Sequence, residues 1–149
     1  MGMFCVALFC GMIAKTESVT LTQHRQDVCV DVVTEAQKQG VDPVLAAAVS
    51  WRESAFLRDV KSSAGAIGPM QVIPRFWCKS KPCDYIEAGV RALKYYTSRH
   101  GEQGGLCAYF SGKPCHRSTR QASSYRSSVI MLAAKFNELW TKSCTDTGC

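Results

Sequence analysis

The sequence predicts a small, mainly α-helical single domain. Its 149 residues are close to the usual length of one domain, and a hydrophobic content of 46% is ordinary for a globular core. Apolar residues recur at helical spacing in several segments, whereas no segment alternates like a strand beside hairpin turn residues. The sequence contains no internal repeat or low-complexity tract. These observations exclude disordered and multidomain architectures.

Several segments carry the helical pattern, and local signals mark their ends. The segment that begins at Pro43 is capped by Asp42 and is apolar nearly all round, so we expect it in the centre of the domain. Asp84 and Glu87 form a capping pair that opens a later helix, which ends at Gly101. The expected helices cover residues 27–39, 43–56, 84–101, 105–110 and 125–141.

Residues 60–74 connect two of these helices and show no periodicity. The segment contains two glycines and two prolines, which favour turns, together with apolar residues such as Ile67 and Met70. We therefore expect an irregular loop that is pressed against the domain.

The nine cysteines indicate either disulfides or a metal site, because a chain of 16.4 kDa in the cytosol usually has far fewer. No two cysteines have the two-residue gap of zinc knuckles or redox motifs, and the three histidines are scattered. Disulfides are therefore favoured, and we expect neither a metal nor a cofactor. The pairing that we expect, one of many connectivities, is Cys78 with Cys83, Cys107 with Cys115, and Cys29 with Cys144 or Cys149.

Disulfides require export, and the N-terminus carries a candidate signal. Residues 3–14 form an uncharged apolar run that matches the apolar region of a signal peptide and is too short to span a bilayer. We divide the chain into residues 1–14, a signal peptide or membrane anchor, and a domain over residues 15–149. The alternative is a buried N-terminal helix. If the run is retained, it provides transient membrane association, and its two cysteines can exchange with those of the domain.

Glu53 is a single acidic residue on the central apolar helix. It lies in line with Leu45 and Val49, at steps of four residues, so it projects from a face of core residues. Partial desolvation there raises the pKa of a carboxyl group and keeps it protonated, as a general acid requires. The alternative is a surface residue, or one paired with Arg52 or Arg58.

Several motifs, in the same order along the chain, resemble those of the soluble lytic transglycosylases. Residues 51–56 (WRESAF) and 63–74 (SAGAIGPMQVIP) resemble the family's Glu-Ser and Gly-Leu-Met-Gln motifs. Residues 108–112 (AYFSG) resemble its Ala-Tyr-Asn-x-Gly motif, and residues 125–129 (YRSSV) its last Tyr-x-x-x-Val element. The resemblance implies a lysozyme-like fold in which the expected disulfides hold two loops beside the cleft.

The resemblance also implies cleavage of the β-1,4 bond between N-acetylmuramic acid and N-acetylglucosamine in bacterial peptidoglycan. Glu53 matches the family's catalytic acid, which protonates the leaving oxygen and then takes a proton from the muramyl C6 hydroxyl to close a 1,6-anhydro ring. The N-acetyl group of the substrate replaces the second carboxylate of ordinary glycosidases. Between Glu53 and Cys83 the only other acid is Asp59, so lysozyme-type hydrolysis is disfavoured and remains the alternative.

The remaining motif residues imply a substrate-binding cleft around the acid. Ser54 can bond near the acid, and the amide of Gln71 can bond to sugar groups. Two positions depart from the family pattern: Pro69 replaces the usual Leu, and Phe110 replaces the usual Asn and so loses a polar contact. The expected substrate-binding residues are Ser54, Gly68, Met70, Gln71, Tyr109, Phe110 and Tyr125.

The net charge of +6 suits a polyanionic cell wall as partner. A basic stretch lies near the expected end of the cleft, at Lys113, Arg117, Arg120 and Arg126. No nucleic-acid-binding motif accompanies the charge, so we do not expect nucleic acid as a partner. We expect an exported monomer that acts on peptidoglycan strands in the periplasm or cell wall, as a phage endolysin or a wall-opening enzyme of a secretion apparatus. A non-catalytic peptidoglycan-binding module is the other alternative.

Overall fold

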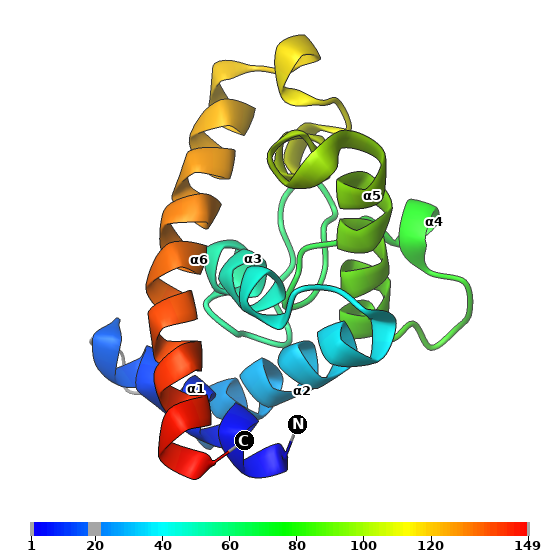
Figure 1. Cartoon of the computed structure of the whole chain (residues 1–149). Helices are drawn as coiled ribbons and strands as arrows, with labels where there is room; N and C mark the ends of the chain where they lie inside the picture. The colour runs from blue at the N-terminus through cyan, green and yellow to red at the C-terminus, as the bar shows by residue number, and fades with distance from the viewer. Residues whose placement is uncertain (1, 18–21, 149) are drawn as a thin grey trace.

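The computed structural model describes residues 2–17 and 22–148, and every regular element in these residues is a helix (Figure 1). Within them, β pairing is limited to two isolated bridges, which join Ile67 to Lys61 and to Val72. The mainly α prediction is confirmed. The elements are α1 (Met3–Thr16), α2 (Gln23–Gln39), α3 (Pro43–Ser54), α4 (Pro74–Trp77), α5 (Tyr85–Ser111), the 3-10 turn η1 (Cys115–Arg117) and α6 (Arg120–Thr147).

Capping residues explain where the helices differ from the expected bounds. The side chain of Thr22 accepts a hydrogen bond from the Arg25 amide, so α2 begins before residue 27. Thr119 caps α6 in the same way, before the apolar stripe starts. α3 ends at Ser54 because the next two residues have positive φ. The element α5 contains two helical segments joined at Gly101, whose backbone (φ 73°, ψ 173°) is not helical, so the expected end of a helix at Gly101 is confirmed.

α3 lies at the centre of the domain, as its apolar sequence predicts. It packs against α2 and α6, while α5 closes the far side by contacting the same two helices (Figure 1). The side chains from Val44 to Ser50 are buried. Glu53 is therefore carried at the end of a helix whose position is fixed by the core.

The N-terminal apolar run forms α1, which packs against α2 and α6. Phe9 is fully buried and makes edge-to-face contacts with Phe136 and Trp140 of α6. Glu17, just after the helix, pairs with Lys135 of α6. No helix in the described part of the chain has both the length and the apolar character needed to cross a membrane. In the folded chain, the run is thus part of the hydrophobic core.

Two of the expected disulfides are confirmed and one is wrong. Cys78 pairs with Cys83, and Cys107 pairs with Cys115. Cys29 pairs with Cys10 of α1, instead of with Cys144 or Cys149, because α1 packs directly on α2. Cys144 is a free, partly buried thiol, and Cys149 lies outside the described residues. The error arose because the expected pairing left the N-terminal run outside the domain.

The loop between α3 and α4 folds back onto the end of α3. The hydroxyl groups of Ser50 and Ser54 both donate hydrogen bonds to the carbonyl oxygen of Pro69, at 3.0 and 2.8 Å. Gly68, with φ at 84°, lies so close to Tyr85 that an added Cβ would be 2.7 Å from the Tyr85 Cβ. The loop is irregular and pressed against the domain, as expected, and it brings Met70 and Gln71 to the carboxyl-bearing end of α3.

Candidate active site

Glu53 and Tyr125 form the centre of the candidate active site. The Tyr125 hydroxyl, from α6, donates a hydrogen bond of 2.7 Å to Oε1 of Glu53. Burial raises the pKa of the Glu53 carboxyl above its ordinary value of 4.5, while the Tyr125 hydrogen bond and the charge of Arg52 partly oppose this. The predicted desolvation of this acid is confirmed. The arrangement favours a carboxyl group that can both donate and accept a proton.

Tyr125 is held between aromatic and cationic neighbours. Its ring is nearly fully buried and lies 4.9 Å from the ring of Phe110, at an interplanar angle of 30°. The guanidinium of Arg52, a residue of α3, lies 5.9 Å from the centroid of the same ring. Burial and the nearby Glu53 charge raise the pKa of Tyr125 well above 10, so its hydroxyl stays protonated and donates to Glu53.

The Met70 and Gln71 backbone is fixed by a second tyrosine. The Tyr109 hydroxyl donates a 2.6 Å hydrogen bond to the carbonyl oxygen of Met70. Met70 is fully buried against Gly89 of α5, where an added Cβ would be 2.5 Å from the Met70 Cβ. Met70 and Tyr109 therefore shape the wall beside Glu53, and position 89 requires glycine because Met70 leaves no room there for a side chain.

Two predicted substrate-binding residues bond mainly to their own protein. The Ser54 hydroxyl donates to Pro69, as described above, and so secures the loop. The Gln71 side-chain nitrogen donates to the backbone carbonyls of Val60 and Gly68, at 3.0 and 2.9 Å. Gln71 also has a positive φ of 52° and lines a cavity. These bonds were not predictable from spacing, since they depend on how the loop closes.

An aromatic cavity of about 250 Å³ lies beside this centre. Its lining includes Tyr109 and Phe110, which connect it to the Glu53 centre through Met70 and Tyr125. Three aromatic residues of the lining, Phe76, Trp77 and Tyr96, were not predicted as site residues, although the pairs Phe-Trp and Tyr-Tyr in the sequence are a signal that could have indicated them. The cavity is lined by Gln71, Val72, Ile73, Phe76, Trp77, Ala92, Tyr96, Tyr109, Phe110, Ser111 and Gly112.

No carboxylate lines the aromatic cavity in the described structure, and Glu53 itself adjoins the cavity through Tyr125 and Phe110 instead of lining it. Asp59 is exposed and borders a different cavity, which also contains Arg58, Lys61 and Tyr85. Among residues 2–17 and 22–148, no three His, Cys, Asp or Glu side chains come together as a metal-ligand set. The polar side chains of the cavity lining are thus those of Tyr96, Tyr109, Ser111 and Gln71, while Tyr125 and the desolvated acid Glu53 adjoin it.

Comparison with known proteins identifies the family. Residues 32–130 match the family described as Transglycosylase SLT domain, a span that holds Glu53, the loop at Gln71, and Tyr125. Searches of curated proteins and of solved structures find no match. The matched family implies peptidoglycan as substrate and supports lytic transglycosylase activity in general. On the strength of a match that covers most of its length, the chain belongs to the SLT transglycosylase domain family, with a lysozyme-like, mainly α fold.

Proposed function

We propose that the protein cleaves the β-1,4 bond between N-acetylmuramic acid and N-acetylglucosamine and leaves a 1,6-anhydro-muramyl end. The observation that carries this proposal is the partly buried carboxyl group of Glu53, whose pKa is raised by desolvation and which accepts a hydrogen bond from Tyr125. The family match supplies the substrate class, and the geometry supports Glu53 as the acid.

In the first step, protonated Glu53 donates its proton to the glycosidic oxygen as the bond to muramyl C1 breaks. The N-acetyl group of the substrate stabilises the positive charge that develops at C1. In the second step, ionised Glu53 takes the proton of the muramyl C6 hydroxyl, and the oxygen attacks C1. The proton count balances, and the carboxyl group returns to its protonated state. Between the two steps, the hydrogen bond from Tyr125 stabilises the ionised carboxylate of Glu53.

The cavity that we propose for the sugar chain is aromatic, which suits the apolar faces of pyranose rings. Gln71, Tyr109 and Phe110 are the predicted substrate-binding residues that line it. Ser54, Gly68 and Met70 act on the substrate through the shape of the loop, since their contacts are with the protein. Tyr125 acts on Glu53, because its hydroxyl donates a hydrogen bond to the carboxyl group of that residue.

Hydrolysis of the same bond is the second candidate, and Asp59 is the residue that it would use. An inverting or retaining hydrolase requires a second carboxylate across the scissile bond. Asp59 borders a separate cavity, which favours the single-acid scheme. A non-catalytic binding module would have no use for a buried carboxyl group, whose burial costs stability.

Product analysis and two matched variants test these alternatives. Digestion of purified peptidoglycan should release muropeptides lighter by one water than hydrolytic products, as measured by mass spectrometry. Glu53→Gln should lower the rate about 10²- to 10⁴-fold, the usual contribution of a general acid, while Asp59→Asn should leave it unchanged. Reducing-end products, or loss of activity in the Asp59 variant, would instead support a hydrolase. Binding to the wall without any soluble product would support a binding module.

We also propose that the protein works outside the cytoplasm, in the periplasm or cell wall, as a monomer. Disulfides form in such compartments, and the apolar run at residues 3–14 provides an export signal. A phage endolysin and a wall-opening enzyme of a secretion apparatus are the two settings that fit. Neighbouring genes distinguish them, because holin and tail genes accompany the first and secretion genes the second.

A further inference from the structure

The charges of the chain are divided unequally around the aromatic cavity. Residues 60–83 and residues 103–137 together contain nine of the 18 Lys and Arg residues and none of the 12 Asp and Glu residues. The rest of the chain, with nine cations and 12 acids, has a net negative charge. The net charge of +6 therefore arises entirely from these two stretches.

Both stretches form walls of the aromatic cavity. Residues 71–73, 76 and 77 come from the first stretch, and residues 109–112 from the second. Arg75 adjoins the lining and stacks its guanidinium 4.5 Å from the ring of Phe76, and Lys113 directly follows Gly112. We name as the cationic rim the exposed basic residues that continue from these walls: Arg75, Lys79, Lys81, Lys113, Arg117 and Arg120.

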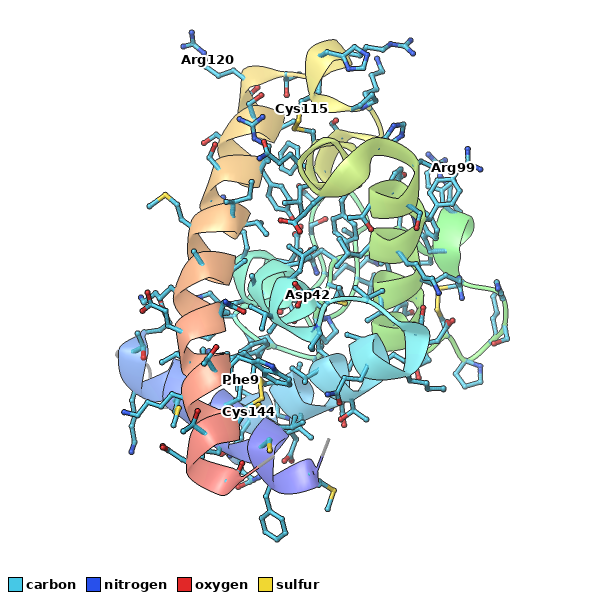
Figure 2. All side chains as sticks on the ribbon, viewed as in Figure 1. Phe9, Asp42, Arg99, Cys115, Arg120 and Cys144 are labelled. Atoms are coloured by element: carbon cyan, nitrogen blue, oxygen red, sulfur yellow. A yellow bond between two sulfur atoms is a disulfide. The ribbon has the colours of Figure 1, made fainter. Side chains whose placement is uncertain are left out.

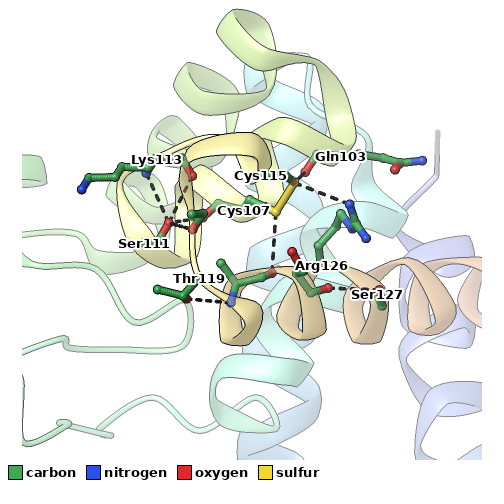
Figure 3. Close-up of a disulfide and its surroundings, with 11 residues drawn as sticks. Gln103, Cys107, Ser111, Lys113, Cys115, Thr119, Arg126 and Ser127 are labelled. Atoms are coloured by element: carbon green, nitrogen blue, oxygen red, sulfur yellow. Dashed lines mark hydrogen bonds between the residues drawn. A yellow bond between two sulfur atoms is a disulfide. The ribbon is translucent and has the colours of Figure 1, made fainter.

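Two disulfides hold the backbone of the rim. Cys78–Cys83 closes the short loop that carries Lys79 and Lys81. Cys107–Cys115 ties the loop of Lys113 to α5, and the Arg126 guanidinium donates to the Cys115 sulfur at 3.6 Å (Figure 3). Arg120 points outward at the end of the molecule that also carries Cys115 (Figure 2). A restrained loop loses less conformational entropy when its cations bind an anion.

The cations of the rim are available to an outside partner. The ion pairs within the described residues use Lys38, Arg58, Arg91 and Lys135, and none of them uses a rim residue. Arg75, Lys79 and Lys81 border one hollow of the surface, and like charges that lie close together repel each other, so an anionic ligand relieves that repulsion. The partner of the rim must therefore carry negative charge and extend beyond the cavity that holds the sugar.

We propose that the cationic rim binds the carboxylates of the peptide stems of peptidoglycan, so that the enzyme acts preferentially on strands that carry stems. This inference rests on the proposed function. The sugar hydroxyl and acetamido groups are neutral, and the lactyl carboxyl group of a muramyl residue is uncharged while it forms the amide bond to a stem. The negative charge of a stem-bearing strand therefore lies in its stems, which leave the glycan at muramyl residues. A muramyl residue near the aromatic cavity brings its stem to the rim, where Lys and Arg meet the carboxylates.

The test compares two forms of one substrate: purified peptidoglycan strands with their stems, and the same strands after an amidase has removed them. Hydrolysis of that amide bond leaves a single lactyl carboxylate on each muramyl residue, so the comparison measures the stem carboxylates against this fixed charge on the sugar. Both preparations are stripped of wall polymers that contain phosphodiesters. The rim variant is Lys79→Gln, Lys81→Gln, Lys113→Gln and Arg117→Gln combined. One exposed ion pair is worth about 1.4-fold to fivefold, so the four changes should lower kcat/KM on stem-bearing strands about tenfold and leave the rate on stem-free strands unchanged.

Charge-matched controls separate this effect from net charge. The variant Lys15→Gln, Lys38→Gln, Lys94→Gln and Lys142→Gln removes four exposed cations outside the rim, and should retain the preference for stems. The wild-type preference should disappear at about 1 M salt, where the screening length falls to about 3 Å. Equal losses on both substrates, or an equal loss in the control variant, would overturn the proposal. So would a preference that appears only when phosphodiester polymers are left in place.

The proposed function can fail independently of this inference. Cleavage of stem-free strands by the wild-type protein, lost in Glu53→Gln, establishes the chemistry without any contribution from stems. If that cleavage is seen but stems make no difference, only the stem proposal is wrong.

Discussion

The hydroxyl of Tyr125 lies 2.7 Å from Oε1 of Glu53 and joins α6 to the end of α3 by a hydrogen bond. The two residues are 72 positions apart in sequence. Two opposing effects on the acid meet in this contact: burial favours the neutral carboxyl form, while the donated hydrogen bond favours the carboxylate. The proposed reaction needs both forms, so this balance determines the pH at which the enzyme works.

Tyr125→Phe should shift the pH profile of kcat/KM. Loss of the hydroxyl removes a contact that lowers the Glu53 pKa, so that pKa should rise further. Because the general acid must be protonated, the alkaline limb of the profile should move to higher pH. The maximal rate should fall about tenfold to a hundredfold, because a hydrogen bond to a charged group contributes about 1.5–3 kcal/mol. The measurement is the rate of muropeptide release over a range of pH.

Tyr109→Phe is the control for that experiment. Its hydroxyl donates to the Met70 carbonyl instead of to Glu53, so its loss should reduce activity without moving the alkaline limb. If the alkaline limb stays unchanged in Tyr125→Phe, or shifts equally in both variants, Tyr125 is not the group that lowers the pKa of Glu53.

Glu53→Gln should stabilise the fold at neutral pH while it lowers the rate about 10²- to 10⁴-fold. The folded-state pKa of Glu53 is raised, so its contribution to stability is complete below the ordinary value of 4.5 and is lost as the pH rises through the folded-state value. Gln carries no charge to desolvate and still accepts the Tyr125 hydrogen bond. The melting temperature of the variant should exceed that of wild type at about pH 7.5, with the difference closing at about pH 4. Glu102→Gln, at an exposed position, controls for the charge change.

Gly89→Ala should disturb the loop that carries Met70 and Gln71. The new methyl group would lie 2.5 Å from the Met70 Cβ and 2.8 Å from its sulfur, so Met70 must move. Overpacking of this kind costs about 1–3 kcal/mol, and the displaced carbonyl would weaken its bond to Tyr109. We expect a lower free energy of unfolding together with reduced activity. Gly11→Ala, in a helix where an added Cβ meets nothing within 4 Å, should have neither effect, and similar losses in both variants would argue against this contact.

Local signals predicted the helices well because the cause of each lies within a few residues. Asp42 and Asp84 accept hydrogen bonds from the first amides of α3 and α5, as their positions in the sequence predict. The apolar surface of α3 predicts its central place. The early part of α6 was missed, since its polar residues carry no apolar stripe and only the Thr119 cap marks the start.

Partners that are distant in sequence could not be derived from spacing. The line of Leu45, Val49 and Glu53 predicts a desolvated acid, and burial confirms it. The contact with Tyr125 depends on how α6 crosses α3, which no local pattern specifies. The same limit explains the wrong partner for Cys29, because that pairing depends on whether α1 belongs to the fold.

The last prediction concerns α1, which we expect to remain attached in the exported protein. Its buried residues fill the contact with α2 and α6, and they are Cys5, Val6, Phe9, Cys10 and Ile13. Removal of residues 1–14 would expose the apolar surface under Phe9 and break the Cys10–Cys29 bond. The intact mass of the oxidised protein, purified after export, should therefore include residues 3–16, and peptide mapping should find Cys10 joined to Cys29.

The Cys10→Ser, Cys29→Ser variant measures what this bond contributes. The disulfide closes a loop with a sequence separation of 19, and a crosslink of that size stabilises a fold by about 3 kcal/mol. The free energy of unfolding in urea should fall by that amount, because the unfolded chain regains the freedom that the crosslink removed. Cys144→Ser changes a free thiol and should have little effect. A mass that begins after Ala14 would mean that α1 is dispensable and that the apolar run serves export alone. Equal stability of the double variant and the wild type would mean that the Cys10–Cys29 bond does not stabilise the fold.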